Sequence, residues 1–343
     1  MRISRRALLA GGAGALALGL GLHAANSRPR GADDSSDLAI EATPIPHLLP
    51  GAPTQTRFGA LTYRGGLALT SAYPSFGGLS ALWRSSDGTS LVSLSDNAMW
   101  LTARPVYAAG RLAGLEAARM APLLDADGTP LWRTKAYDTE SLAIADGVAF
   151  VGIERVHEVR RFAWAAQGVS ARGEPVAMPP EVKALPDNES LEAVGIVPCG
   201  QPLAGALFAI AERSRTGDDT PTRGWILTGP ETGAFDVVRS HAFDITDITF
   251  LASGAALMLE RRFNLIDGVA CRIRRIAANA IRPGATVDGE VIFEADRRHE
   301  IDNMEGIATH RDPASGDLVV TLVSDDNFNH RLQRNLLLEF TLA

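Results

Sequence analysis

Carboxylate side chains recur along this sequence at intervals that could bring them into one site. Glu140, Glu192 and Glu305 each precede a small residue and then an apolar one. Asp247 begins a looser copy of this motif, and Gly77 takes the corresponding place near the start of the chain. These five anchors are 63, 52, 55 and 58 residues apart. Such a period indicates structural repeats, and acids gathered in this way could bind a metal cation.

A cluster of carboxylates requires a counter-ion, because like charges held close together raise one another's pKa. Carboxylate and amide oxygens suit Ca²⁺, which does not demand a strict geometry. We therefore predict a Ca²⁺ site with these ligands: Glu140, Glu192, Asp247, Asn303 and Glu305. More acids end the next apolar runs and are expected nearby: Asp96, Glu154, Glu212, Glu260 and Asp325. The structural alternative is that these acids cap turns and pair with neighbouring arginines.

A metal held by such a site could activate a water molecule and polarise a substrate oxygen. The residues expected to be catalytic are Glu140, Glu192, Glu305 and Arg261. The residues expected to bind the anionic part of a substrate are Arg213, Arg262 and Asn327. A covalent nucleophile is not supported, because the segment around Ser80 lacks the closing glycine of a nucleophile elbow.

The elements that would position these residues are short β-strands. Each anchor opens a short strand, and a second apolar run follows after a turn. Repeats of this length with several strands each are typical of propeller blades, whose inner strands line an axial channel. Acids at one end of successive inner strands would converge on one mouth of that channel. We predict an all-β protein, a β-propeller of six blades with five as the alternative, closed by pairing of N- and C-terminal strands.

The N-terminal region is expected to lie outside the propeller. Residues 1–25 contain Ser4-Arg5-Arg6 followed by a Gly/Ala/Leu run, which predicts a twin-arginine signal peptide. That run is too short and too rich in glycine to favour a membrane span, and an uncleaved anchor is the alternative. Residues 26–56 contain five prolines and predict an extended lead-in linker. Residues 57–343 are then enough for one propeller domain.

Charge and cysteine content restrict the partners. The formal charge is −7, and it becomes −10 (−7 minus 3) when the three arginines of the signal are removed. An acidic chain without a basic run is a poor partner for nucleic acid or anionic lipid. We expect a monomer in the periplasm or outside the cell that acts on a small molecule. For Cys199 and Cys271 we favour free, buried thiols over a disulfide.

Several of these segments, taken in order, carry a family resemblance. They are Asp138–Leu142, Asn188–Glu192, the Leu-Glu-Arg-Arg-Phe run from Leu259, the Met-Glu-Gly-Ile run from Met304, and Ser324–Phe328. From about Phe58 to the C-terminus the chain resembles the phytase-like family with esterase-like activity. The resemblance implies an exported hydrolase of phosphate or carboxylate esters.

Two further readings bear on the function. The Glu-Gly start of a strand is also similar to calcium-dependent lactonase and arylesterase propellers, in which such a glutamate holds the metal. The competing functional class is a non-catalytic periplasmic propeller that binds a ligand or acts as a scaffold, because propellers support many unrelated functions.

Overall fold

The computed structural model describes residues 31–343 except 187, 188, 216 and 218. The predicted signal peptide, residues 1–25, lies outside the described residues. In the described part of the chain, no helix is long and apolar enough to cross a membrane. Regular structure in this part is almost entirely β-strand, as predicted.

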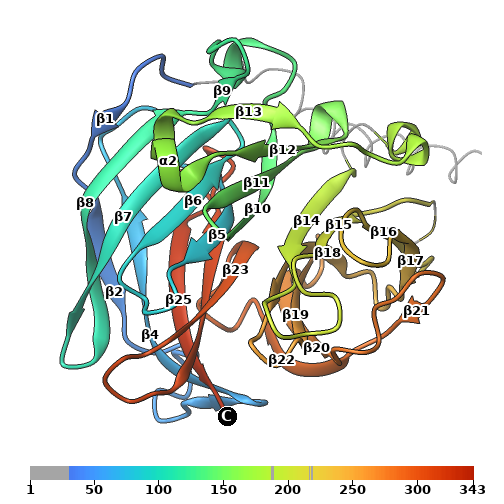
Figure 1. Cartoon of the computed structure of the whole chain (residues 1–343). Helices are drawn as coiled ribbons and strands as arrows, with labels where there is room; N and C mark the ends of the chain where they lie inside the picture. Colours follow the sequence, from blue (N-terminus) through green and yellow to red (C-terminus); the bar gives the residue numbers. More distant parts are fainter. Residues whose placement is uncertain (1–30, 187–188, 216, 218) are drawn as a thin grey trace, which may run out of the picture. The chain divides into compact units, whose positions relative to one another are not determined.

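Five sheets, named blades 1 to 5 here, account for the described strands (Figure 1). The propeller therefore has five blades, which was the alternative to the favoured prediction of six. Each of the five anchors corresponds to one blade, and the described strands form no sixth sheet. Blade 1 contains β5 (Leu79–Arg84), β6 (Leu91–Ser95), β7 (Met99–Ala108), β8 (Arg111–Pro122) and, at its outer edge, β1 (Ser36–Asp37). Blade 2 contains β10 (Thr139–Ala145), β11 (Val148–Ile153), β12 (Glu158–Phe162), β13 (Arg172–Pro175) and β9 (Leu124–Asp125).

The other blades repeat this order. Blade 3 contains β14 (Leu191–Ile196), β15 (Leu207–Ala211), β16 (Thr222–Ile226), β17 (Gly233–Val237) and β21 (Thr286–Val287). Blade 4 contains β18 (Asp244–Phe250), β19 (Ala256–Asn264), β20 (Gly268–Ile276) and β22 (Glu290–Asp296). Blade 5 contains β23 (Asn303–Arg311), β24 (Leu318–Asp325), β25 (Asn335–Leu342), β4 (Leu61–Thr70) and β2 (Glu41–Ile45), and β3 (Arg57–Phe58) pairs with β4. The first four strands of each blade pair in antiparallel fashion, whereas the outermost pairs β13–β9 of blade 2 and β17–β21 of blade 3 are parallel.

Helical segments are short and lie between the strands. They are η1 (Leu131–Arg133), η2 (Glu154–Val156), α2 (Trp164–Gln167), η3 (Gly168–Ser170) and η4 (Pro180–Ala184).

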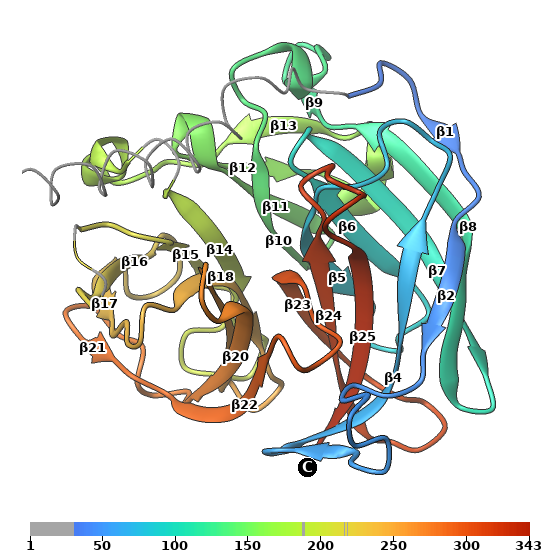
Figure 2. The same ribbon diagram turned by 180° about the vertical axis from the view of Figure 1, so that it is seen from behind.

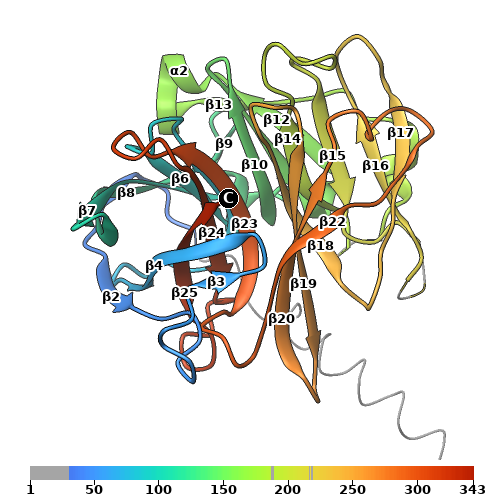
Figure 3. The same ribbon diagram turned by 90° about the horizontal axis from the view of Figure 1, so that it is seen from below.

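The first strand of each blade lies at the centre of the propeller. β5 contacts β10 and β23, β14 contacts β10 and β18, and β18 contacts β23, so the five inner strands form a closed circle. Figure 3 shows β10, β14, β18 and β23 together between the sheets. All five inner strands run in the same direction along the axis. Their N-terminal ends therefore lie at the same end of it.

N-terminal and C-terminal strands close the propeller, as predicted. β4 lies between β2 and β25 in blade 5 (Figure 2) and pairs with β25 from Leu61 to Leu69. Residues 26–56 were predicted to form an extended linker, but the described part of this segment contributes strands to the blades: β1 pairs with β8, and β2 pairs with β4. Leu48 in the same segment is fully buried in the core. These pairings cover strand edges that would otherwise be exposed.

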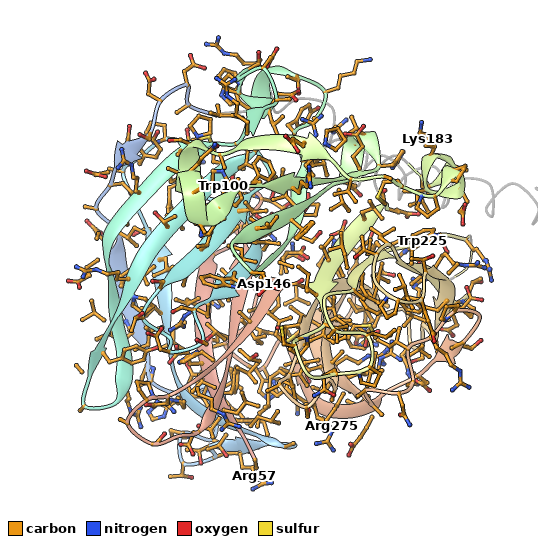
Figure 4. The ribbon with its side chains drawn as sticks, in the orientation of Figure 1. Arg57, Trp100, Asp146, Lys183, Trp225 and Arg275 are labelled. Atoms are coloured by element: carbon orange, nitrogen blue, oxygen red, sulfur yellow. The ribbon has the colours of Figure 1, made fainter. Side chains whose placement is uncertain are left out.

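Apolar side chains fill the spaces between neighbouring blades, so the inner strands are buried on both faces, whereas outer strands such as β8 have exposed residues. Every residue of β6 and of β15 is buried, which explains why these strands read as continuous apolar runs. Trp100 of blade 1, labelled in Figure 4, packs edge-on against Phe162 of blade 2, with 5.3 Å between the ring centroids. Both cysteines are free; Cys271 is buried as expected, whereas Cys199 is exposed.

Close approach of neighbouring inner strands predicts the effect of adding one methyl group at Gly306. A Cβ there would lie 2.8 Å from the backbone nitrogen of Leu82 and 2.9 Å from the backbone carbonyl carbon of Ala81. We expect Gly306→Ala to lower the free energy of unfolding by about 1–3 kcal/mol in chemical denaturation, because backbone must move. Gly114→Ala is the matched control, since a Cβ there meets nothing within 4 Å. Equal stability of the two variants would contradict the close packing at the axis.

Candidate functional site

A β-bulge interrupts the inner strand of every blade at the same place. The extra residues, each unpaired between two registered neighbours, are Ser80, Glu140, Glu192, Thr246 and Glu305. A bulge redirects its side chain, so these five positions are structurally equivalent. The predicted anchors Glu140, Glu192 and Glu305 are bulge residues. In blades 1 and 4 the bulge residues are Ser80 and Thr246. The anchors predicted there, Gly77 and Asp247, are therefore not equivalent to the three glutamates.

The two hydroxyl bulge residues connect neighbouring blades. Ser80 Oγ donates to the carbonyl oxygen of Thr139 at 2.5 Å, and Thr246 Oγ1 donates to that of Met304 at 3.2 Å. Both acceptors directly precede a bulge glutamate in the next blade. Two blades therefore use the bulge for an inter-blade hydrogen bond, and three use it to present a carboxylate.

Two more equivalent positions surround each bulge. The residue two places before the bulge is, in blade order, Gly78, Asp138, Ser190, Asp244 and Asn303. In each blade this residue pairs through its backbone with a residue at the end of the second strand. In the same blade order these partners are Asp96, Glu154, Glu212, Arg261 and Asp325. Together with the bulge glutamates these positions supply nine carboxylates, which we call the acid cluster: Asp96, Asp138, Glu140, Glu154, Glu192, Glu212, Asp244, Glu305 and Asp325.

Arg261 occupies the position at which every other blade has an acid. Its Nε lies 2.8 Å from Glu305 Oε1, and its Nη2 lies 3.3 Å from Glu212 Oε1. Burial raises the pKa of Glu212 to about 7 even though Arg261 opposes the shift. The side chain of Arg261 is 29% exposed, whereas those of Glu305 and Glu212 are 7% and 8% exposed.

Three further arginines pair with members of the acid cluster. Arg155 Nε lies 2.9 Å from Asp138, Arg213 Nη2 lies 2.6 Å from Asp244, and Arg239 also donates to Asp244. Nine carboxylates therefore face four guanidinium groups among the described residues, a formal deficit of five positive charges. Protons or a bound cation must supply the difference.

The tightest group of acids belongs to blade 2. Asp138, Glu140 and Glu154 each offer a carboxylate oxygen, and these oxygens lie within 4.8 Å of one another. Elsewhere in the cluster, Glu305 Oε2 and Asp96 Oδ1 are buried and have no hydrogen-bond partner. The cluster therefore offers both a convergent set of oxygens and lone pairs that no protein donor uses.

Burial and like charge shift the pKa of these acids in one direction. Burial raises the pKa of Glu154 to about 8, and the neighbouring Asp138 carboxylate adds to the shift. Burial likewise raises the pKa of Asp325 to about 8, with a contribution from Glu305. The same causes, burial first and neighbouring acids second, hold the pKa well above its ordinary value in Asp96, Glu140 and Glu192. The pKa values of Glu154 and Asp325 therefore lie well above the ordinary range of carboxyl groups.

Two acids expected at this site have other partners. Asp247 lies one residue beyond the bulge, and its two oxygens accept the backbone N–H groups of Ile248 and Ile307, both at 2.8 Å. It joins β18 to β23. Glu260 is fully buried between Arg272 and Arg274, at 2.5 and 2.6 Å, because adjacent residues of a strand point to opposite faces.

The remaining predicted residues lie at or beyond the edge of the acid cluster. Asn303 donates through Nδ2 to Glu305 Oε1 at 2.7 Å, so it orients that glutamate. Arg213 is held by Asp244, as described above. Arg262 donates to the carbonyl oxygen of His241 and lies 4.8 Å above the ring of Phe243. The side chain of Asn327 donates to Gln333.

Sequence reasoning did not assign Asp138 or Asp244 to the site. Both lie two residues before a bulge residue. The equivalent residues of the other blades are Gly78, Ser190 and Asn303, which are not acids, so the repeat has no shared residue type at this position. The only available signal was the Asp-Thr-Glu spacing of residues 138–140.

The opposite end of the inner strands has a different character. A pocket of about 550 Å³ lies there, lined mainly by apolar residues such as Trp83, Ile144, Ile196 and Phe250. Asp146, labelled in Figure 4, is the one carboxylate in its lining. The acid cluster therefore lies at the other end of the axis from this pocket.

Comparison with known families agrees with this arrangement. A family model described as phytase-like, "esterase-like activity of phytase", matches residues 74–328. The chain belongs to this family. The match confirms the resemblance predicted from the sequence, and it includes every member of the acid cluster.

Other comparisons with this phytase-like protein are more distant. The PQQ-bound form of aldose sugar dehydrogenase from Streptomyces coelicolor is a similar solved structure, with 12% identity and a TM-score of 0.40. The similarity covers 90% of this chain and 99% of that chain. No curated protein matches the chain.

Raised carboxyl pKa values predict the pH dependence of stability without added metal. Between about pH 4, where carboxyls of the unfolded chain titrate, and pH 8, the folded state binds more protons than the unfolded state. The free energy of unfolding in EDTA should therefore fall as the pH rises from 5 to 8. Urea titrations at successive pH values measure it.

Glu154→Gln should make this pH dependence shallower, because it removes one group whose pKa is raised by burial. Glu174→Gln is the matched control, since Glu174 is 59% exposed and pairs with Arg161 away from the cluster. A stability that rises steadily from pH 5 to pH 8 in the unmutated protein would contradict the raised pKa values.

Proposed function

We propose that this phytase-like protein is an exported hydrolase of phosphate or carboxylate esters, assisted by Ca²⁺ at the acid cluster. The observation that carries the proposal is the deficit of positive charge among nine clustered carboxylates, three of which converge within 4.8 Å. Family membership supports ester chemistry. Export rests on the twin-arginine motif of the sequence.

The residues present fit a hard divalent cation. Asp138, Glu140 and Glu154 offer only oxygen, and no histidine or cysteine joins the group. Oxygen ligands favour Ca²⁺ or Mg²⁺ over zinc, and Ca²⁺ best tolerates an irregular set completed by water. Glu305 adds a buried oxygen without a hydrogen-bond partner at the same end of the axis. We assign Asp138, Glu140 and Glu154 as the protein ligands.

The other cluster residues then have separate roles. A bound Ca²⁺ would polarise the ester oxygen and lower the pKa of a coordinated water. Glu192 lies beside Glu154 and Glu212, and a bound cation would oppose the rise in its pKa, so that its carboxylate could accept a proton from water. Arg261 and Arg155, both partly exposed, would hold the anionic part of the substrate.

Six residues predicted from the sequence have supporting or peripheral roles in this scheme. Asn303 and Arg261 fix Glu305 through its Oε1 atom. Asp247 secures the spacing of β18 and β23 through backbone amides. Arg213, Arg262 and Asn327 would contact only a substrate that extends beyond the cluster.

Chelation tests the cation requirement. EGTA should abolish hydrolysis of p-nitrophenyl phosphate or p-nitrophenyl acetate, and added Ca²⁺ should restore it. Glu140→Gln should weaken Ca²⁺ binding by at least about tenfold and lower kcat by about 100-fold, because it removes a ligand charge without changing size. Colorimetric kinetics and calorimetric titration measure the two effects.

Glu116→Gln is the control variant, since Glu116 is 56% exposed on β8 and pairs only with Arg104 at the surface. Its kinetics should equal those of the unmutated protein. Unchanged turnover in EGTA would contradict the role of the cation. Tight Ca²⁺ binding without turnover of any ester would instead favour the non-catalytic binding propeller.

A further inference from the structure

A histidine–aspartate pair lies beside the acid cluster and has no role in the scheme above. His330 Nδ1 is hydrogen-bonded to Asp326 Oδ2. The side chain of His330 is 56% exposed, whereas that of Asp326 is 1% exposed. An exposed imidazole ordered by a buried carboxylate is a common arrangement for proton transfer in enzymes.

Asp326 is held rigidly by three other donors. Its Oδ1 accepts the backbone N–H of Gly78 at 2.9 Å and that of Phe328 at 3.1 Å. Its Oδ2 accepts Asn335 Nδ2 at 2.7 Å. Because the carboxylate only accepts hydrogen bonds, the hydrogen of a neutral His330 ring lies on Nδ1, and Nε2 is left to exchange a proton.

Contacts of two glycines place this pair at the rim of the acid cluster. A Cβ at Gly77 would lie 3.1 Å from His330 Cε1, and one at Gly78 would lie 3.1 Å from Asp96 Oδ2. Gly77 and Gly78, which directly precede β5, therefore lie next to the imidazole of His330 and next to Asp96, a member of the cluster. Asp325, another member, directly precedes Asp326 in the chain.

The loop that carries His330 is in an unusual backbone conformation. Asn327 and Phe328 both have left-handed backbone, with φ of 49° and 51°. Their N–H groups are bonded to the carboxylates of Asp325, at 2.6 Å, and Asp326. Two consecutive left-handed residues other than glycine are costly and persist only where other contacts impose them, a feature that gathers at functional sites.

We propose that His330 is the general acid of the hydrolysis, with Asp326 as its positioning residue. This inference rests on the hydrolase function proposed above. Glu192 takes a proton from water as the water oxygen bonds to the ester carbon or phosphorus. The bond to the leaving oxygen breaks, and that oxygen receives the Nε2 proton of the doubly protonated His330 ring, which is left in the neutral Nδ1–H form. Glu192 then releases its proton to solvent, and His330 regains one from solvent.

The leaving group provides the test. A p-nitrophenolate leaves without protonation, whereas an alkoxide requires it. His330→Gln should lower kcat by about 100-fold or more for an alkyl ester such as methyl butyrate or glycerol phosphate, whichever ester type the protein turns over. The same variant should lower kcat less than about threefold for the matching p-nitrophenyl ester. Free imidazole should partly restore alkyl ester turnover in His330→Ala.

His299→Gln is the matched control, because His299 also pairs with an aspartate, Asp296, at 3.0 Å, in blade 4. Its kinetics should not change for either substrate. Long-range ¹⁵N spectra should show the Nδ1–H form of His330, lost in Asp326→Asn. Equal losses for both leaving groups, or no loss, would overturn the proposal. Turnover that ignores EGTA but shows the leaving-group difference would refute the cation alone and leave His330 as the acid.

Discussion

Repulsion among buried carboxylates at one end of the propeller axis is the constraint on which the rest of this site depends. Burial removes the water that would screen these charges, and each acid raises the pKa of its neighbours. Four arginines compensate only part of the charge. Without a balancing charge, such an arrangement is expected to cost stability near neutral pH, and the proposed Ca²⁺ would supply that charge.

Geometry brings the acids together through two features of the fold. Closure of the chain by β4 and β25 completes the circle of inner strands, and a bulge in each strand points one side chain away from the regular alternation. Where the bulge residue is Ser80 or Thr246, it joins two blades; where it is glutamate, it supplies charge. Arg261 replaces an acid at one of the equivalent positions, and this makes the cluster asymmetric. An asymmetric cluster can separate a cation at blade 2 from an anion at Arg261.

Much of the fold followed from the sequence, because blade strands buried on both faces read as apolar runs separated by turns. Glu140, Glu192 and Glu305 were identified because a small residue follows each of them. The anchors at Gly77 and Asp247 lie three residues before and one residue after the bulge residues Ser80 and Thr246. The reason is that strands buried on both faces read as continuous apolar runs, which do not reveal the residue that the bulge presents. Long-range contacts explain other differences. Neither the pairing of β1 and β2 with the propeller nor the ion pair between Arg261 and Glu305 has a local signal.

Calorimetric titration of metal-free protein with Ca²⁺ at pH 7, in two buffers of different ionisation enthalpy, tests the central claim most directly. If the charge deficit is filled by protons in the metal-free state, each Ca²⁺ bound should release at least about one proton, seen as a buffer-dependent heat. Ca²⁺ binding with no proton release, or no binding at millimolar Ca²⁺, would contradict the claim.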